Sequence, residues 1–172
     1  MMARVMGVRD PAVLRRASDL GIAFQLTTIA RDVVPDQAAG RVYLPRQWLE
    51  EAGLSREDMA TAANRDRLFA VVARLLDLAE PYYASSRVGM AQLPFRAAWA
   101  VGAASAVYRD IGTLVRQRGA EAWDQRASTS PTRKLAGVAA GLSAAINRRT
   151  LASGMDTPSR EGLWTPSSLR AE

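Results

Sequence analysis

Apolar residues recur along this chain at spacings of three and four, which is typical of amphipathic α-helices, and no stretch shows the period of two expected of a half-buried strand. Asp10 before Pro11 is typical of a helix start. Pro94 and Gly119 enclose another apolar run, since proline favours the first helical position and glycine the end of a helix. The predicted fold class is therefore all-α. Helices are predicted over about residues 11–34, 45–53, 64–92, 95–118 and 132–149.

Residues 18–36 carry the most informative pattern. Outside one narrow polar arc, most positions of this segment are apolar, with Thr27 and Arg31 as interruptions, which is typical of a largely buried helix rather than a surface helix. This arc spans roughly 80° when the helix is projected at about 100° per residue. We therefore expect this polar stripe to face something polar inside the protein. The stripe consists of Ser18, Gly21, Gln25, Thr28, Asp32 and Asp36.

Asp32 and Asp36 lie four residues apart, so their carboxylates are neighbours on one helix face and repel each other. Neither acid has a lysine or arginine four residues away. A hard cation would compensate the repulsion, and Mg²⁺ fits because it accepts carboxylate oxygens together with substrate phosphates. The alternative is a solvated helix end, because Pro35 lies between the acids and could end the helix there. The spacing alone leaves both interpretations open.

The loop that follows, QAAGRVYLP at 37–45, extends this pattern. Together, the run LG…FQLTTIARDVVPD…GRVYLP resembles the second signature of the squalene and phytoene synthase family. That signature has a glycine, a glutamine, an asparagine, an Asp-x-x-x-Asp pair and then Arg-x-aromatic-x-Pro. Later segments resemble bacterial carotenogenic phytoene synthases in the same order, so the resemblance covers roughly residues 1–150. The matching residues are Gly21, Gln25, Thr28, Asp32, Asp36, Arg41, Tyr43 and Pro45.

The resemblance implies the all-α fold of class I isoprenoid synthases, in which two Asp-rich helices face each other across a cavity. This sequence departs from the family at three points. Thr28 replaces the family's asparagine, Pro35 replaces a residue that is usually acidic or polar, and the family's other Asp-rich motif lies upstream of anything in this sequence. We therefore expect the chain to correspond to the C-terminal portion of a family member, without the N-terminal helices that carry half of the metal site.

The implied reaction is the head-to-head condensation of two geranylgeranyl diphosphate molecules to phytoene, a step of carotenoid biosynthesis. Mg²⁺ bound to Asp32 and Asp36 would help the diphosphate leave, and the cavity would keep water from the allylic cation. The sequence does not distinguish this substrate from farnesyl diphosphate, which the squalene branch uses. The implied catalytic residues are Asp32, Asp36 and Tyr108, and the implied substrate-binding residues are Gln25, Thr28, Arg31, Arg41, Tyr43 and Arg126.

A non-catalytic role is the alternative. Thr28, Pro35 and the missing first motif also fit a degenerate relative that binds a prenyl diphosphate, or a partner helix, without turning it over. Two further features each allow a structural and a functional interpretation. Tyr82 and Tyr83 fit core packing or a site role, and the small residues at 97–106 fit close helix packing or room for a ligand.

Composition narrows the class of protein further. Of 172 residues, 48% are hydrophobic, which is enough to fill one core. The formal charge of +6 comes almost entirely from arginine, and the richness in arginine and alanine indicates a GC-rich genome rather than a nucleic-acid-binding surface. With no cysteine and no long apolar stretch, the protein is predicted to be cytoplasmic, and its positive charge would also suit peripheral association with anionic lipid headgroups. Residues 1–150 are predicted to form one helical domain and 151–172 a flexible tail, while the oligomeric state is not determined by the sequence.

Overall fold

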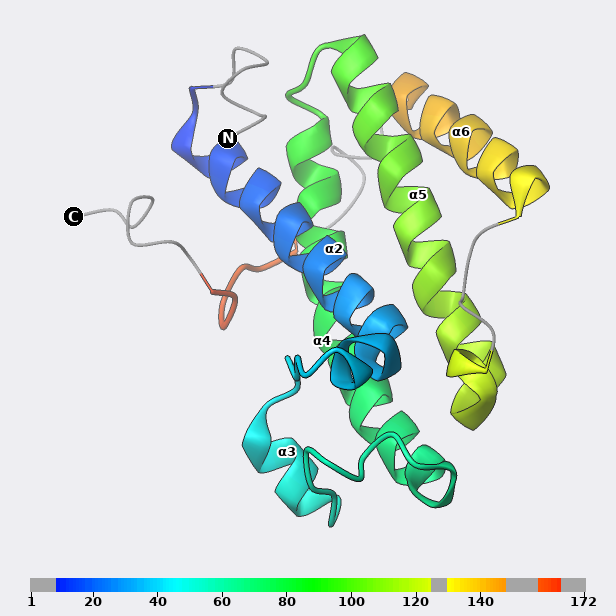
Figure 1. The fold of residues 1–172 in the computed structure, drawn as a ribbon. Coiled ribbons are helices and arrows are strands. Elements are labelled where there is room, and N and C mark those ends of the chain that lie inside the picture. The colour runs from blue at the N-terminus through cyan, green and yellow to red at the C-terminus, as the bar shows by residue number, and fades with distance from the viewer. Residues whose placement is uncertain (1–8, 125–129, 148–157, 165–172) are drawn as a thin grey trace.

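The computed structural model describes residues 9–124, 130–147 and 158–164. Within these ranges the chain forms five α-helices and two short 3₁₀ turns, without a strand, which confirms the all-α prediction (Figure 1). The α-helices are α2 (Pro11–Ala38), α3 (Arg46–Glu51), α4 (Arg65–Met90), α5 (Phe95–Arg118) and α6 (Pro131–Ile146), and the 3₁₀ turns are η1 (Ala62–Asn64) and η2 (Gly119–Trp123).

Helices α2, α4 and α5 pack against one another, and α6 packs on α5 (Figure 1). The main core lies between α2, α4 and the α3 region, where Leu49, Leu68 and Val72 are almost fully buried. A second cluster of apolar residues lies nearer the start of α2 and includes Tyr82 and Tyr83 of α4. Both tyrosines are buried, so the core-packing interpretation of this pair is confirmed.

Helix α2 is longer than the sequence predicted, because it continues through Pro35 to Ala38 instead of ending near residue 34. Proline removes one backbone hydrogen bond wherever it lies in a helix. Here it lies in the last turn with its ring exposed, so little of the helix depends on the missing bond. The interpretation of Pro35 as a helix stop is therefore wrong, and Asp32 and Asp36 lie on one continuous helix.

The small residues of α5 allow α6 to approach very closely. A Cβ atom added at Gly141 of α6 would lie 2.3 Å from the backbone nitrogen of Ala103, and one added at Gly102 would lie 3.2 Å from the Cα atom of Gly141. These distances leave no room for side chains at the contact. Close helix packing therefore accounts for the small residues around position 102.

Candidate functional site

The polar stripe of α2 lies about half a turn around the helix from the face that packs on α4 and α5. That packed face carries the buried residues Ala23, Thr27 and Ala30. Gln25 and Gly21 of the stripe are exposed instead. The expectation that the stripe faces the interior is therefore wrong for Gly21 and Gln25, while its other four residues, Ser18, Thr28, Asp32 and Asp36, are half-buried. A helix packs through the face that removes most apolar area from water, and for α2 that face is opposite to the stripe.

Asp32 is held by the residue that precedes it. The guanidinium group of Arg31 donates from Nε to Oδ1 at 2.9 Å and from a terminal nitrogen to Oδ2 at 2.5 Å. Only 15% of the Asp32 side chain is exposed. The pKa of Arg31 is raised, chiefly by this hydrogen bond, with smaller contributions from Tyr108 and Asp36. Both carboxylate oxygens of Asp32 thus already have a cationic donor.

Asp36 is held by Arg41 from the loop after the helix. The Arg41 guanidinium group donates to Oδ1 of Asp36 at 3.0 Å, and the backbone N–H of Arg41 donates to the Asp36 carbonyl oxygen at 2.8 Å. Gly40 has a φ of +77°, a conformation that glycine adopts without steric cost, and it turns the chain back toward the helix end. The sequence search for partners four residues away missed this contact because it depends on a turn rather than on helical spacing.

Tyr108 of α5 packs against α2 through an aromatic contact. Its ring stacks on the ring of Phe24, with the centroids 4.2 Å apart and the planes 19° from parallel. Tyr108 also contributes a little to the raised pKa of Arg31. Tyr108 thus takes part in the contact between α2 and α5.

The other predicted site residues are spread more widely. Tyr43 is 53% exposed in the loop before α3, Gln25 is exposed and Thr28 is half-buried. Arg126 lies outside the residues that the structure describes. Among the predicted residues, the structure therefore joins Arg31 to Asp32 and Arg41 to Asp36 through ion pairs.

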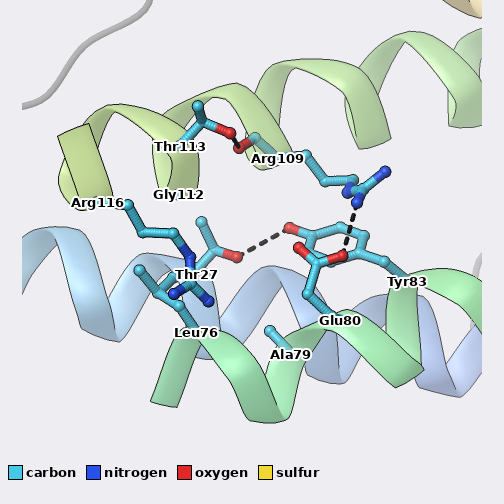
Figure 2. A pocket seen from close by; sticks show the side chains of 9 residues that line it. All are labelled: Thr27, Leu76, Ala79, Glu80, Tyr83, Arg109, Gly112, Thr113 and Arg116. Atoms are coloured by element: carbon cyan, nitrogen blue, oxygen red, sulfur yellow. Dashed lines mark hydrogen bonds and ion pairs between the residues drawn. The ribbon is translucent and has the colours of Figure 1, made fainter. Parts of the chain in front are cut away.

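A small cavity lies behind the stripe, where α2, α4 and α5 meet (Figure 2). Thr27 shares a hydrogen bond of 2.9 Å with the hydroxyl group of Tyr83 there, and Arg109 forms an ion pair with Glu80 at 2.6 Å. Burial raises the pKa of Tyr83 to about 12, although the hydrogen bond with Thr27 opposes this shift. None of the predicted site residues within the described ranges lines the cavity.

This cavity is too small for a prenyl chain. Its volume is about 20 Å³, which is room for about one water molecule. The sequence treated Thr27 only as a polar interruption of an apolar pattern. A threonine inside a helix can donate its hydroxyl hydrogen to the carbonyl oxygen four residues earlier, and Thr27 does so with Ala23 at 2.9 Å. This possibility is the feature of the sequence from which a buried threonine could have been predicted.

The donor chemistry of the stripe fits Mg²⁺ in part. Asp32 and Asp36 offer hard carboxylate oxygens on one side of a continuous helix. Among the described residues, no group of three or more acidic, histidine or cysteine side chains lies close enough together to hold a metal ion. The two acids could therefore supply some of the ligands of a Mg²⁺ ion, and Arg31 would first have to release the oxygens of Asp32.

The pattern of the squalene/phytoene synthase family matches residues 1–133 of this sequence. The chain belongs to the squalene/phytoene synthase family. It is 51% identical over 164 residues to a 15-cis-phytoene synthase of Enterobacter agglomerans, covering 95% of this chain and 55% of that protein. It is 52% identical over 165 residues to a 15-cis-phytoene synthase of a Paracoccus species, covering 96% of this chain and 52% of that protein.

This family member spans about half the length of the curated relatives it matches. The predicted family, and the prediction that the resemblance covers only part of a member, are both confirmed. No solved structure matches the chain. Among the described helices, none is long and apolar enough to cross a membrane.

Proposed function

We propose that this chain supplies the second Asp-rich half of a Mg²⁺-dependent synthase that condenses two geranylgeranyl diphosphate molecules to phytoene. The observation that carries the proposal is the position of Asp32 and Asp36, which lie in the family's spacing on one continuous helix. Their side of α2 is opposite to the packed face, so further helices could lie against it. In a full-length member those helices would bring the first Asp-rich motif across from this pair and complete a class I isoprenoid synthase fold.

The arginines of the stripe suggest how the site would bind its substrate. Arg31 and Arg41 now neutralise the two acids. Mg²⁺ would replace them as the positive charge beside the carboxylates and would stabilise the negative charge that builds on the departing diphosphate. The released guanidinium groups are suited to diphosphate oxygens, because a planar fork of N–H groups binds such oxygens in pairs. Tyr108, stacked on Phe24, would form part of the cavity wall.

The test compares this chain with a version extended upstream through the missing Asp-rich motif. We expect Mg²⁺-dependent release of diphosphate from geranylgeranyl diphosphate by the extended chain, with phytoene as the product. Arg46→Gln is the control for substitutions at the site, because the ion pair of Arg46 with Glu50 is exposed and lies on α3. An extended chain that folds but makes no phytoene, or one whose activity survives replacement of both Asp32 and Asp36 by asparagine, would refute the proposal.

A binding module is the second candidate, and the ion pairs at both acids favour it. A site whose carboxylates already have cationic partners can persist without a metal ion. Calorimetric titration of geranylgeranyl diphosphate into the unextended chain, with and without Mg²⁺, separates the possibilities. Metal-linked heat would indicate prenyl diphosphate binding by this portion alone, and heat that is unaffected by Mg²⁺ would indicate a site that does not use these acids for metal.

A further inference from the structure

Asp19 is an acid that the sequence pattern did not single out, and it is completely buried on the packed face of α2. The hydroxyl group of Ser85, from α4, donates to its Oδ2 atom at 2.5 Å. Arg16, one turn earlier on α2, donates to the carbonyl and hydroxyl oxygens of Ser85, each at 3.1 Å. A polar contact between α2 and α4 thus lies within a largely apolar interface, and it contains a carboxylate that needs a counter-ion.

The counter-ion comes from the far end of the chain. Arg160 donates from Nε to Oδ2 of Asp19 at 2.7 Å and from a terminal nitrogen to Oδ1 at 2.6 Å. Its side chain is 17% exposed, so the pair is largely shielded from water. The pKa of Arg160 is raised, chiefly by its hydrogen bond to Asp19. This two-point geometry is the strong form of an arginine–carboxylate contact.

The residues after Arg160 continue along the same interface. Leu163 packs against the apolar cluster that contains Leu20 and Tyr82. The backbone N–H of Trp164 donates to the hydroxyl group of Tyr82 at 3.2 Å. Residues 158–164, drawn in red beside α2 in Figure 1, therefore contact both α2 and α4 through an ion pair, an apolar side chain and a backbone hydrogen bond.

We propose that residues 158–164 form a latch that fixes α2 against α4, and that Arg160 is the cation on which the burial of Asp19 depends. A carboxylate that loses its bidentate partner in a dry interface must either recruit water or move apart from its neighbours. The latch would thus hold the first half of α2 in place. The same helix carries Asp32 and Asp36, so the latch would also help to position the candidate site. Only this connection to the site rests on the proposed function.

A double-mutant cycle on the full chain tests the latch. Arg160→Gln is expected to raise the equilibrium constant for unfolding roughly 100-fold, because it leaves Asp19 buried without its counter-ion. Adding Asp19→Asn to this variant removes the buried charge and should recover at least roughly tenfold of that loss. Arg46→Gln, in an exposed pair, is the control and should change the constant by less than roughly fivefold. An Arg160→Gln effect as small as the control, or single effects that simply multiply in the double variant, would overturn the proposal.

Hydrogen exchange provides a second measurement should Arg160→Gln not fold. Arg160→Lys keeps the charge but loses the two-point contact, so we expect faster exchange of amides in residues 11–23 and 79–90. Amides at the Gly102–Gly141 contact of α5 and α6 should be unchanged. An increase spread evenly over the molecule, or none at all, would refute the latch. Neither measurement uses Mg²⁺ or a diphosphate, so this result is independent of the test of the proposed synthase.

Discussion

At the scale of single residues, three acids of α2 each have an arginine partner. Arg31 neutralises Asp32, Arg41 neutralises Asp36, and Arg160 neutralises Asp19. The environments of these pairs differ, because the Asp36 pair lies near the surface and the Asp19 pair is shielded. Contacts of the same chemical type should therefore differ widely in how much they stabilise the fold.

Arg41→Ala is expected to lower the free energy of unfolding by less than about 1 kcal/mol, because the Arg41 side chain is 56% exposed and its ion pair is screened by water. Urea denaturation of the variant and of the parent chain measures this difference. The same change at Arg46, also in an exposed pair, is the reference. A loss well above that of the reference would show that Arg41 supports the fold rather than being available for a substrate.

Tyr83 should make the stability of the protein depend on pH in the alkaline range. Its pKa of about 12 in the folded chain exceeds the ordinary value of 10.0, so its contribution is complete below pH 10 and is lost as the pH rises toward 12. Two units correspond to at most about 3 kcal/mol. Tyr83→Phe should therefore show a shallower fall in unfolding free energy between pH 10 and 12 than the parent chain.

The Tyr83→Phe variant should also lose about 1 kcal/mol at neutral pH, because its hydrogen bond with Thr27 is gone. Tyr43→Phe is the control for the alkaline slope, since the Tyr43 side chain is 53% exposed. Guanidinium denaturation at several pH values gives both quantities. Equal slopes for the parent and for Tyr83→Phe would show that Tyr83 titrates normally.

At the scale of elements, the pairing of α5 with α6 depends on the absence of side chains at one crossing. Gly141→Ala places a methyl group 2.3 Å from the Ala103 nitrogen, a backbone atom that cannot move aside alone. We expect a loss of unfolding free energy of roughly 1–3 kcal/mol, typical of overpacking. Thermal and denaturant unfolding would measure it.

Gly21→Ala provides the opposite case within the same chain. A Cβ atom at Gly21 would have nothing within 4 Å, and the residue lies inside α2. Alanine should therefore stabilise the helix by roughly 0.5–1 kcal/mol. If both glycine variants changed stability in the same direction, the close approach of α5 and α6 would not be the reason that position 141 requires glycine.

At the scale of the whole molecule, the stripe of α2 lies on a side that the described helices do not pack against. An isolated carboxylate pair there would be solvated, whereas a pair covered by further helices would act in a water-poor cavity where charge interactions are stronger. The proposed catalytic role therefore requires further helices that cover the carboxylate pair.

In the upstream-extended chain, Asp32→Asn is expected to lower the rate of Mg²⁺-dependent phytoene formation by at least roughly 100-fold, because a lost carboxylate ligand weakens stabilisation of the leaving diphosphate. Product formation at saturating Mg²⁺ measures the rate. Unfolding of the same variant should change little, since the ion pair of Asp32 with Arg31 joins neighbouring residues of one helix. Comparable losses of activity and stability would instead indicate a structural role for Asp32.

Much of the fold followed from local chemistry. The start of α2 at Pro11 and the end of α5 at Gly119 depend on the φ angles that proline and glycine favour, so the sequence was sufficient to predict them. The end of α2 was not predictable in this way. Whether Pro35 ends a helix depends on whether its ring meets solvent or another helix, and that is known only once the helices are packed.

For the candidate site, the sequence by itself determined which residues belong together, because Asp32 and Asp36 share a helix face through the period of the α-helix and share a family pattern with Arg41 and Tyr43. The direction in which that face points was decided by tertiary structure, since α2 packs through whichever side buries most apolar area. Tertiary structure also decided which arginines neutralise the acids of α2. A turn at Gly40 brings Arg41 back to Asp36, and the return of the chain brings Arg160 to Asp19 across 141 positions, a separation that no helical period can encode.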